Sequence, residues 1–228
     1  MNKYMTGKKM TKISKPVLVA VILTFLYGIF FYFSTSFLWN KGWLISLKDI
    51  TSQNIWIKFL SDIITNLLFV ILIFALIFLK KRPLSEVGLT KNSRLISVLL
   101  LVVYLIMFLS NGDFTVKGVY LAFFYLVIVA FSEEFIFRGY LFTIIDQEYG
   151  FRIGIIVSGL LFGAMHGLLP TIIGNGSLAD LFTNISSNLL GQGIVGGGLF
   201  ALAYKKSGTL FVPILIHAIL DYSSVLFG

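Results

Sequence analysis

The sequence predicts an all-α protein, a polytopic membrane helical bundle with about seven transmembrane helices. Hydrophobic residues make up 57% of the 228 residues and charged residues only 12%, and the mean hydropathy is +0.94. This composition leaves too little polar surface for a water-soluble domain. Apolar runs long enough to cross a hydrocarbon core of ~30 Å recur along the chain, and basic residues gather at their ends.

The predicted spans follow one another without an internal repeat or a low-complexity linker, so a single compact bundle is expected. Most apolar runs are long enough for a helix that rises about 1.5 Å per residue to cross the hydrocarbon core, whereas the third and fifth are short. The seven predicted spans are 17–38, 57–79, 95–110, 118–145, 153–169, 181–204 and 209–227.

The net charge is +8, and the basic residues lie at the ends of the predicted spans and do not form a continuous basic stripe. This distribution predicts membrane topology and no nucleic-acid partner. With a cytoplasmic amino terminus, most basic residues lie inside and the carboxyl terminus lies outside. These inner residues are Lys3, Lys8, Lys9, Lys12, Lys15, Lys80, Lys81, Arg82, Lys91, Arg94, Arg152, Lys205 and Lys206. We therefore expect a multi-pass integral protein of a bacterial cell membrane, with a basic cytoplasmic tail at 1–16.

Titratable residues at membrane depth are costly and usually functional, and here they are few. The chain has two histidines and no cysteine, which excludes disulfides and thiol chemistry. Residues four apart share a helix face, so Glu134 faces Arg138, and Glu133 points about 100° away. His166 follows Phe162 at the same spacing in the next run.

In the last run, Asp221 follows His217 at the same spacing, so three spans each present one polar face. Glu133, His166 and His217 reach the same depth if the fourth helix continues past Arg138 to about Asp146, since the rise is about 1.5 Å per residue. If that helix ended at Arg138, Glu133 would be too shallow to meet His166.

In their order and spacing, these motifs resemble those of the CPBP family, also called Abi or type II CaaX-protease-like intramembrane proteases. The resemblance covers 118–228, the predicted catalytic membrane core, and 17–117 is expected to be a membrane scaffold. It implies an intramembrane endopeptidase that hydrolyses a peptide bond in a membrane-associated peptide or protein. The implied roles are Glu133 activating water with help from His166, His217 and Asp221 stabilising the oxyanion, and Glu134 and Arg138 bracing the helix.

The metal requirement stays open at this point. Two histidines and a carboxylate are a common catalytic zinc set, and Glu133, His166 and His217 could hold zinc or another divalent metal. Glu134 or Asp221 would support such a site. The resemblance implies a metalloprotease by convention, but a metal-free mechanism that depends on glutamate is an equal alternative.

Two other functions fit the same residues. Glutamate, histidine and aspartate inside a bundle also occur in proton- or ion-coupled transporters, although the chain lacks two comparable halves. A non-catalytic membrane regulator or immunity protein of the same fold is the other alternative, but it has no chemical need for Glu133 or His166. Loss of peptide cleavage in a Glu133 variant would favour the protease over both.

Overall fold

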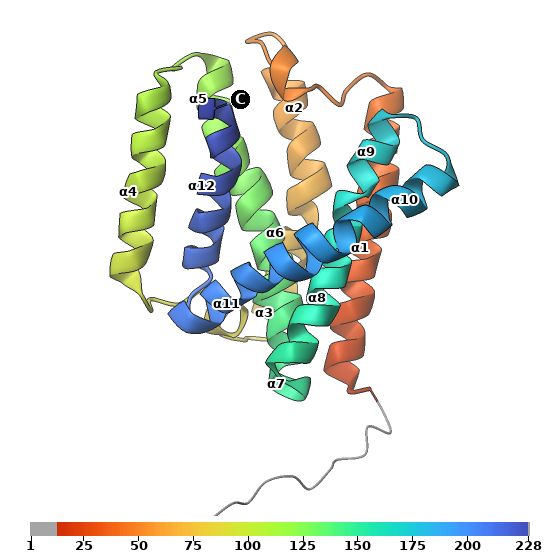
Figure 1. The fold of residues 1–228 in the computed structure, drawn as a ribbon, viewed down its shortest axis with the longest axis vertical. Helices are drawn as coiled ribbons and strands as arrows, with labels where there is room; N and C mark the ends of the chain where they lie inside the picture. Colours follow the sequence, from red (N-terminus) through yellow and green to blue (C-terminus); the bar gives the residue numbers. More distant parts are fainter. Residues whose placement is uncertain (1–12, 228) are drawn as a thin grey trace, which may run out of the picture.

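The computed structural model describes residues 13–227, so most of the tail predicted at 1–16 lies outside the described residues. Every regular element in 13–227 is helical, as predicted, and the helices form one bundle (Figure 1). Six helices in this part of the chain are long and apolar enough to cross a membrane, and a shorter apolar helix follows them. The protein is therefore an all-α, multi-pass integral membrane protein.

The first three spans form the amino-terminal part of the bundle. Their elements are α1 (Lys15–Asn40), α2 (Ile55–Asp62), η2 (Ile63–Leu67), α3 (Leu68–Leu79) and α4 (Arg94–Asn111), with 3-10 turns η1 (Leu47–Asp49) and η3 (Leu84–Val87) between them. Proline near the start of α1 suits the first helical turn, where its missing N–H has no partner to lose.

The last four spans carry the predicted motifs. The fourth span comprises α5 (Val116–Phe123), η4 (Phe124–Phe131), α6 (Ser132–Glu134), η5 (Phe135–Phe142) and α7 (Thr143–Tyr149). The fifth span comprises α8 (Phe151–His166) and α9 (Leu168–Ile173), and the sixth comprises α10 (Leu178–Asn188), η6 (Leu189–Gly196) and α11 (Gly197–Ser207). The last span is α12 (Phe211–Phe227). η4, η5 and η6 contain π-type turns. Such turns flank the glutamate pair on both sides, and π-type turns are frequent at functional sites.

The predicted spans agree with the structure within a few residues, with one correction. The fourth span continues to Tyr149, which fulfils the condition that puts the polar groups at one depth. The fifth span is not short, because its helical path continues through α9 to Ile173. The shortest apolar helix is instead α12, with 17 residues.

Close glycine packing brings α8 against η6. A Cβ on Gly159 would lie 2.8 Å from the carbonyl oxygen of Gly193, and a Cβ on Gly193 would lie 2.6 Å from the carbonyl oxygen of Gly159. Both distances are too short for real atoms, so the two backbones touch only because neither residue has a side chain. Small residues commonly permit such contact between membrane helices.

A second buried polar cluster, which the sequence analysis did not identify, joins the second and fourth spans. Lys58 pairs with Asp62 at 2.7 Å, and both side chains are almost fully buried. The hydroxyl of Tyr120 donates to the other Asp62 oxygen at 2.6 Å. The scaffold predicted for 17–117 thus contains its own buried ion pair, fixed to the motif-bearing part of the chain.

Candidate active site

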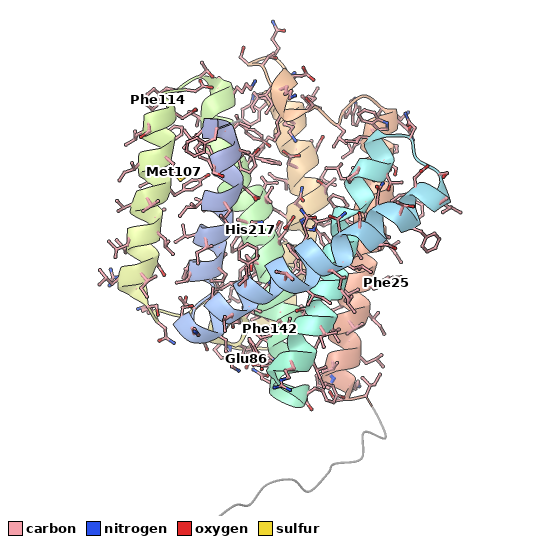
Figure 2. The ribbon with its side chains drawn as sticks, in the orientation of Figure 1. Phe25, Glu86, Met107, Phe114, Phe142 and His217 are labelled. Atoms are coloured by element: carbon pink, nitrogen blue, oxygen red, sulfur yellow. The ribbon has the colours of Figure 1, made fainter. Side chains whose placement is uncertain are left out.

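Three spans bring the predicted residues to the middle of the bundle. Glu133 and Glu134 lie on α6, Arg138 lies on η5, and His166 is the last residue of α8. His217 lies at mid-height on α12, close to the crossing helices of the fourth and sixth spans (Figure 2). This position agrees with the prediction, from helical rise, that His217 lies at the depth of Glu133 and His166.

Glu134 is the centre of a buried three-residue network. Its Oε1 lies 3.0 Å from Nη1 of Arg138, which is the predicted pair between residues four apart. The same oxygen lies 3.0 Å from Nδ1 of His217, which reaches it from the last span. Glu134 and Arg138 have side-chain exposures of 0% and 1%, so neither charge is stabilised by water. A buried ion pair requires such close partners, because removing charges from water is costly.

The other nitrogen of His217 faces two more carboxylates. Nε2 lies 3.4 Å from Oδ2 of Asp221, one turn further along α12, and 3.9 Å from Oε2 of Glu133. The Glu133 oxygen is buried and has no hydrogen-bond partner among the described residues. Oε2 of Glu134 is likewise buried without a hydrogen-bond partner in the described part of the chain, but the side chain of Glu133 is 21% exposed, whereas that of Glu134 is fully buried.

His166 lies apart from this network in the described structure. Its Nδ1 lies 2.9 Å from the carbonyl oxygen of Phe162. A carbonyl oxygen can only accept, so Nδ1 carries the proton and a neutral ring leaves Nε2 as an acceptor. Among residues 13–227, no hydrogen bond or ion pair joins His166 to Glu133, so the assistance implied by the resemblance stays a prediction.

Two phenylalanines enclose the charged groups, and sequence analysis did not assign a site role to either. Phe162 packs its ring centroid 4.5 Å from that of His166, and the Arg138 guanidinium carbon lies 4.0 Å from the Phe162 centroid. Phe200 stacks on His217 with centroids 4.7 Å apart and an interplanar angle of 17°. Phe162 could be identified from the sequence because it lies four residues before His166, whereas Phe200 belongs to no motif.

A glycine in the sixth span makes room for the arginine. A Cβ on Gly197 would lie 2.9 Å from Nη2 of Arg138. Gly197 lies three residues before Phe200, so this segment both admits the guanidinium and covers the imidazole. The glycines of the sixth span thus make room for backbone at Gly193 and for a side chain at Gly197, whereas a Cβ on Gly191 would meet no atom within 4 Å.

The metal hypothesis was tested against the donor atoms that are present. In the part of the chain that the structure describes, no group of three or more histidine, aspartate or glutamate side chains is arranged to hold a metal ion. Nδ1 of His217 is engaged by Glu134, so Nε2 is the ring nitrogen that could face a metal. The metal requirement at Glu133, His166 and His217 therefore stays a prediction, and no chemical step is derived from a metal.

The fold and the site together define a polytopic membrane protein with a buried carboxylate–histidine network between its helices. Residues 115–223 match the family model described as type II CAAX prenyl endopeptidase Rce1-like, a CAAX-type intramembrane protease family. The match confirms the resemblance drawn from the motifs, over almost the same region. Comparisons with curated proteins and with solved structures found no match.

Proposed function

We propose that the protein is an intramembrane endopeptidase that hydrolyses a peptide bond in a membrane-associated protein or peptide. The main support is the contrast between the two adjacent glutamates. Oε1 of Glu134 contacts both Arg138 and His217, and this side chain is fully buried. The side chain of Glu133 is instead 21% exposed, and its Oε2 lies 3.9 Å from Nε2 of His217 without a hydrogen-bond partner among the described residues. A free carboxylate beside a fixed imidazole is suited to general base catalysis.

In the proposed reaction, Glu133 takes a proton from a water molecule as the water oxygen attacks the peptide carbonyl carbon. The carbonyl π electrons move to oxygen and give a tetrahedral oxyanion. Glu133 then returns the proton to the amide nitrogen as the carbon–nitrogen bond breaks, which releases an amine and a carboxylic acid. All atoms of the water are found in the products, so no additional reactant is needed.

His217 is the group proposed to stabilise the oxyanion through Nε2. Its ring cannot rotate freely, because Glu134 holds Nδ1 and Phe200 stacks on one face. A preorganised donor of this kind contributes ~3 to 4 kcal/mol to transition-state stabilisation in a dry site. Asp221 lies on the same nitrogen at 3.4 Å, so its proposed role is to orient His217 and not to contact the oxyanion.

The other residues have proposed positioning roles. Arg138 neutralises Glu134 and leaves Glu133 as the carboxylate available for chemistry. His166 is proposed to help place the water, because Nε2 is its available acceptor. This role requires the water to bridge the two residues, since no direct contact joins His166 to Glu133 among the described residues.

The proposal is tested by incubating the purified protein with a library of membrane peptides and identifying products by mass spectrometry. Glu133→Gln, which preserves side-chain size, is expected to abolish cleavage. Glu148→Gln is the control, because Glu148 is an exposed glutamate near the end of the same span. Cleavage that persists in Glu133→Gln would contradict the proposal. Ligand flux across the membrane without any peptide cleavage would favour a transporter.

The metal question is answered in the same assay. Parallel incubations with and without a chelator show whether cleavage requires a divalent metal. Full activity in chelator is the result expected from the donor arrangement, and lost activity that zinc restores would revive the metalloprotease hypothesis.

A further inference from the structure

A groove separate from the candidate active site lies between α4, η4 and α12. Its volume is about 590 Å³, within the range of about 300 to 1,000 Å³ typical of small-molecule sites. Leu215 of α12 lines the groove, whereas His217, two residues later, faces the active site. Phe211 and Ile214 of the same helix also line the groove, whereas His217 does not, so the groove and the site use different parts of the α12 surface.

The wall of the groove formed by α4 is thinly covered. Tyr104 is the only buried residue of α4, and most of this helix is exposed on the bundle surface. Val98 and Leu101 of α4 face Leu126 and Phe131 of η4 across the groove. Most of the residues that line the groove are thus apolar.

One end of the groove is positively charged. Lys91 and Arg94 line it, and no aspartate or glutamate does. Neither residue forms an ion pair with another side chain in residues 13–227, although Arg82 nearby in sequence pairs with Glu86. These two cations are therefore not neutralised by the described part of the protein.

The backbone adds a further anion-attracting feature at the same end. α4 begins at Arg94, and the side chain of its N-cap residue, Ser93, does not cap the helix. The first N–H groups of a helix point outward without intrahelical partners, and the helix dipole favours negative charge there. The 18-residue length of α4 makes this a full helix terminus.

We propose that this groove binds one anionic phospholipid, with its phosphate headgroup on Lys91 and Arg94 and an acyl chain between α4 and α12. The groove is basic at one end and apolar further along, which matches the charged headgroup and apolar acyl chain of the lipid. The basic groups lie at the span end, and Leu101 lies about 10 Å deeper along α4 at the rise of an α-helix. Basic pockets between membrane helices are known to select anionic headgroups.

The lipid would stabilise the packing of α4 against α12. Since α12 also carries His217, the bound lipid supports the helix that positions the imidazole. The binding proposal itself does not depend on the proposed protease function, so its test measures binding and not cleavage.

Native mass spectrometry of the full chain in detergent, titrated with phosphatidylglycerol or with phosphatidylcholine of identical acyl chains, measures the selectivity. Wild type is expected to retain phosphatidylglycerol in preference to phosphatidylcholine. The double variant Lys91→Ala/Arg94→Ala should bind phosphatidylglycerol about thirtyfold more weakly, as expected for the loss of two basic contacts. Arg152→Ala/Lys206→Ala is the matched control, because it removes two exposed charges that do not line the groove.

A second variant tests the apolar part of the groove without changing its charge. Val98→Trp fills the groove from an exposed position on α4 and should also weaken phosphatidylglycerol binding. Equal binding of both lipids, or an equal loss in the control double variant, would overturn the proposal. Unchanged binding in Val98→Trp would also overturn it, because the headgroup alone would then account for binding. Binding of a lipid-modified peptide in the groove, without binding of phosphatidylglycerol, would also overturn the proposal and assign the groove to a substrate.

Discussion

Nδ1 of His217 lies 3.0 Å from Oε1 of Glu134, so the last span is fixed to the fourth by a histidine–glutamate contact buried inside the bundle. The same oxygen contacts Arg138. This contact separates the roles of two glutamates that are adjacent in sequence. In the proposed mechanism, Glu134 holds the structure of the site and Glu133 acts as the base.

Replacing Arg138 by methionine should leave Glu134 as a buried carboxylate with His217 as its remaining partner. Removal of one member of a buried ion pair costs about 3 to 5 kcal/mol, so a large fall in the free energy of unfolding in detergent is expected. The double variant Arg138→Met/Glu134→Gln should recover much of this loss, since no uncompensated charge remains. A double variant no more stable than Arg138→Met would contradict the pairing.

Replacing His217 by phenylalanine should lower both stability and activity. The variant loses a hydrogen bond to a charged group, which corresponds to about 1.5 to 3 kcal/mol, while the aromatic stack on Phe200 is preserved. Thermal unfolding in detergent measures the first effect and peptide cleavage the second. Unchanged stability would show that the contact between His217 and Glu134 does not hold the two spans together.

Alanine at Gly193 should separate α8 from η6. Its Cβ would lie 2.6 Å from the backbone oxygen of Gly159, and such overpacking typically costs about 1 to 3 kcal/mol. Gly191→Ala is the matched control in the same helix, because a Cβ there meets no atom within 4 Å. The unfolding free energies of the two variants should therefore differ clearly; similar values would indicate that the glycine contact is not close in solution.

Asparagine at Asp62 should destabilise the scaffold. Lys58 would remain buried without a carboxylate, at a cost of about 3 to 5 kcal/mol. Lys58→Met combined with Asp62→Asn removes that isolated charge, and the amide oxygen can still accept from Tyr120, so most of the stability should return. Equal unfolding free energies for wild type and Asp62→Asn would show that the buried pair contributes little.

Much of the fold was predictable because hydropathy over about 20 residues identifies membrane spans without knowledge of packing. The length of the fifth span was underestimated, because the predicted apolar run ends at Leu169, before Pro170, whereas the structure accommodates this proline in α9. Proline is tolerated in membrane helices when neighbouring groups satisfy the freed backbone.

The site was predictable within each helix but not between helices. Spacing of four residues correctly paired Glu134 with Arg138 and placed Asp221 beside His217. It could not give the rotation of one helix against another, which decides that His217 meets Glu134 and that Phe200 covers the ring. For the same reason, the partnership of Lys58 with Asp62 was accessible from spacing, but their contact with Tyr120 was not.

Cleavage of an identified peptide in water enriched in ¹⁸O is the most direct test of the role of Glu133. The wild-type protein should produce a new carboxyl group that contains one ¹⁸O atom from the solvent. Glu133→Gln should give no such product, although its unfolding temperature should equal that of the wild type. Labelled product formed at the wild-type rate by folded Glu133→Gln would contradict the assignment of Glu133 as the base.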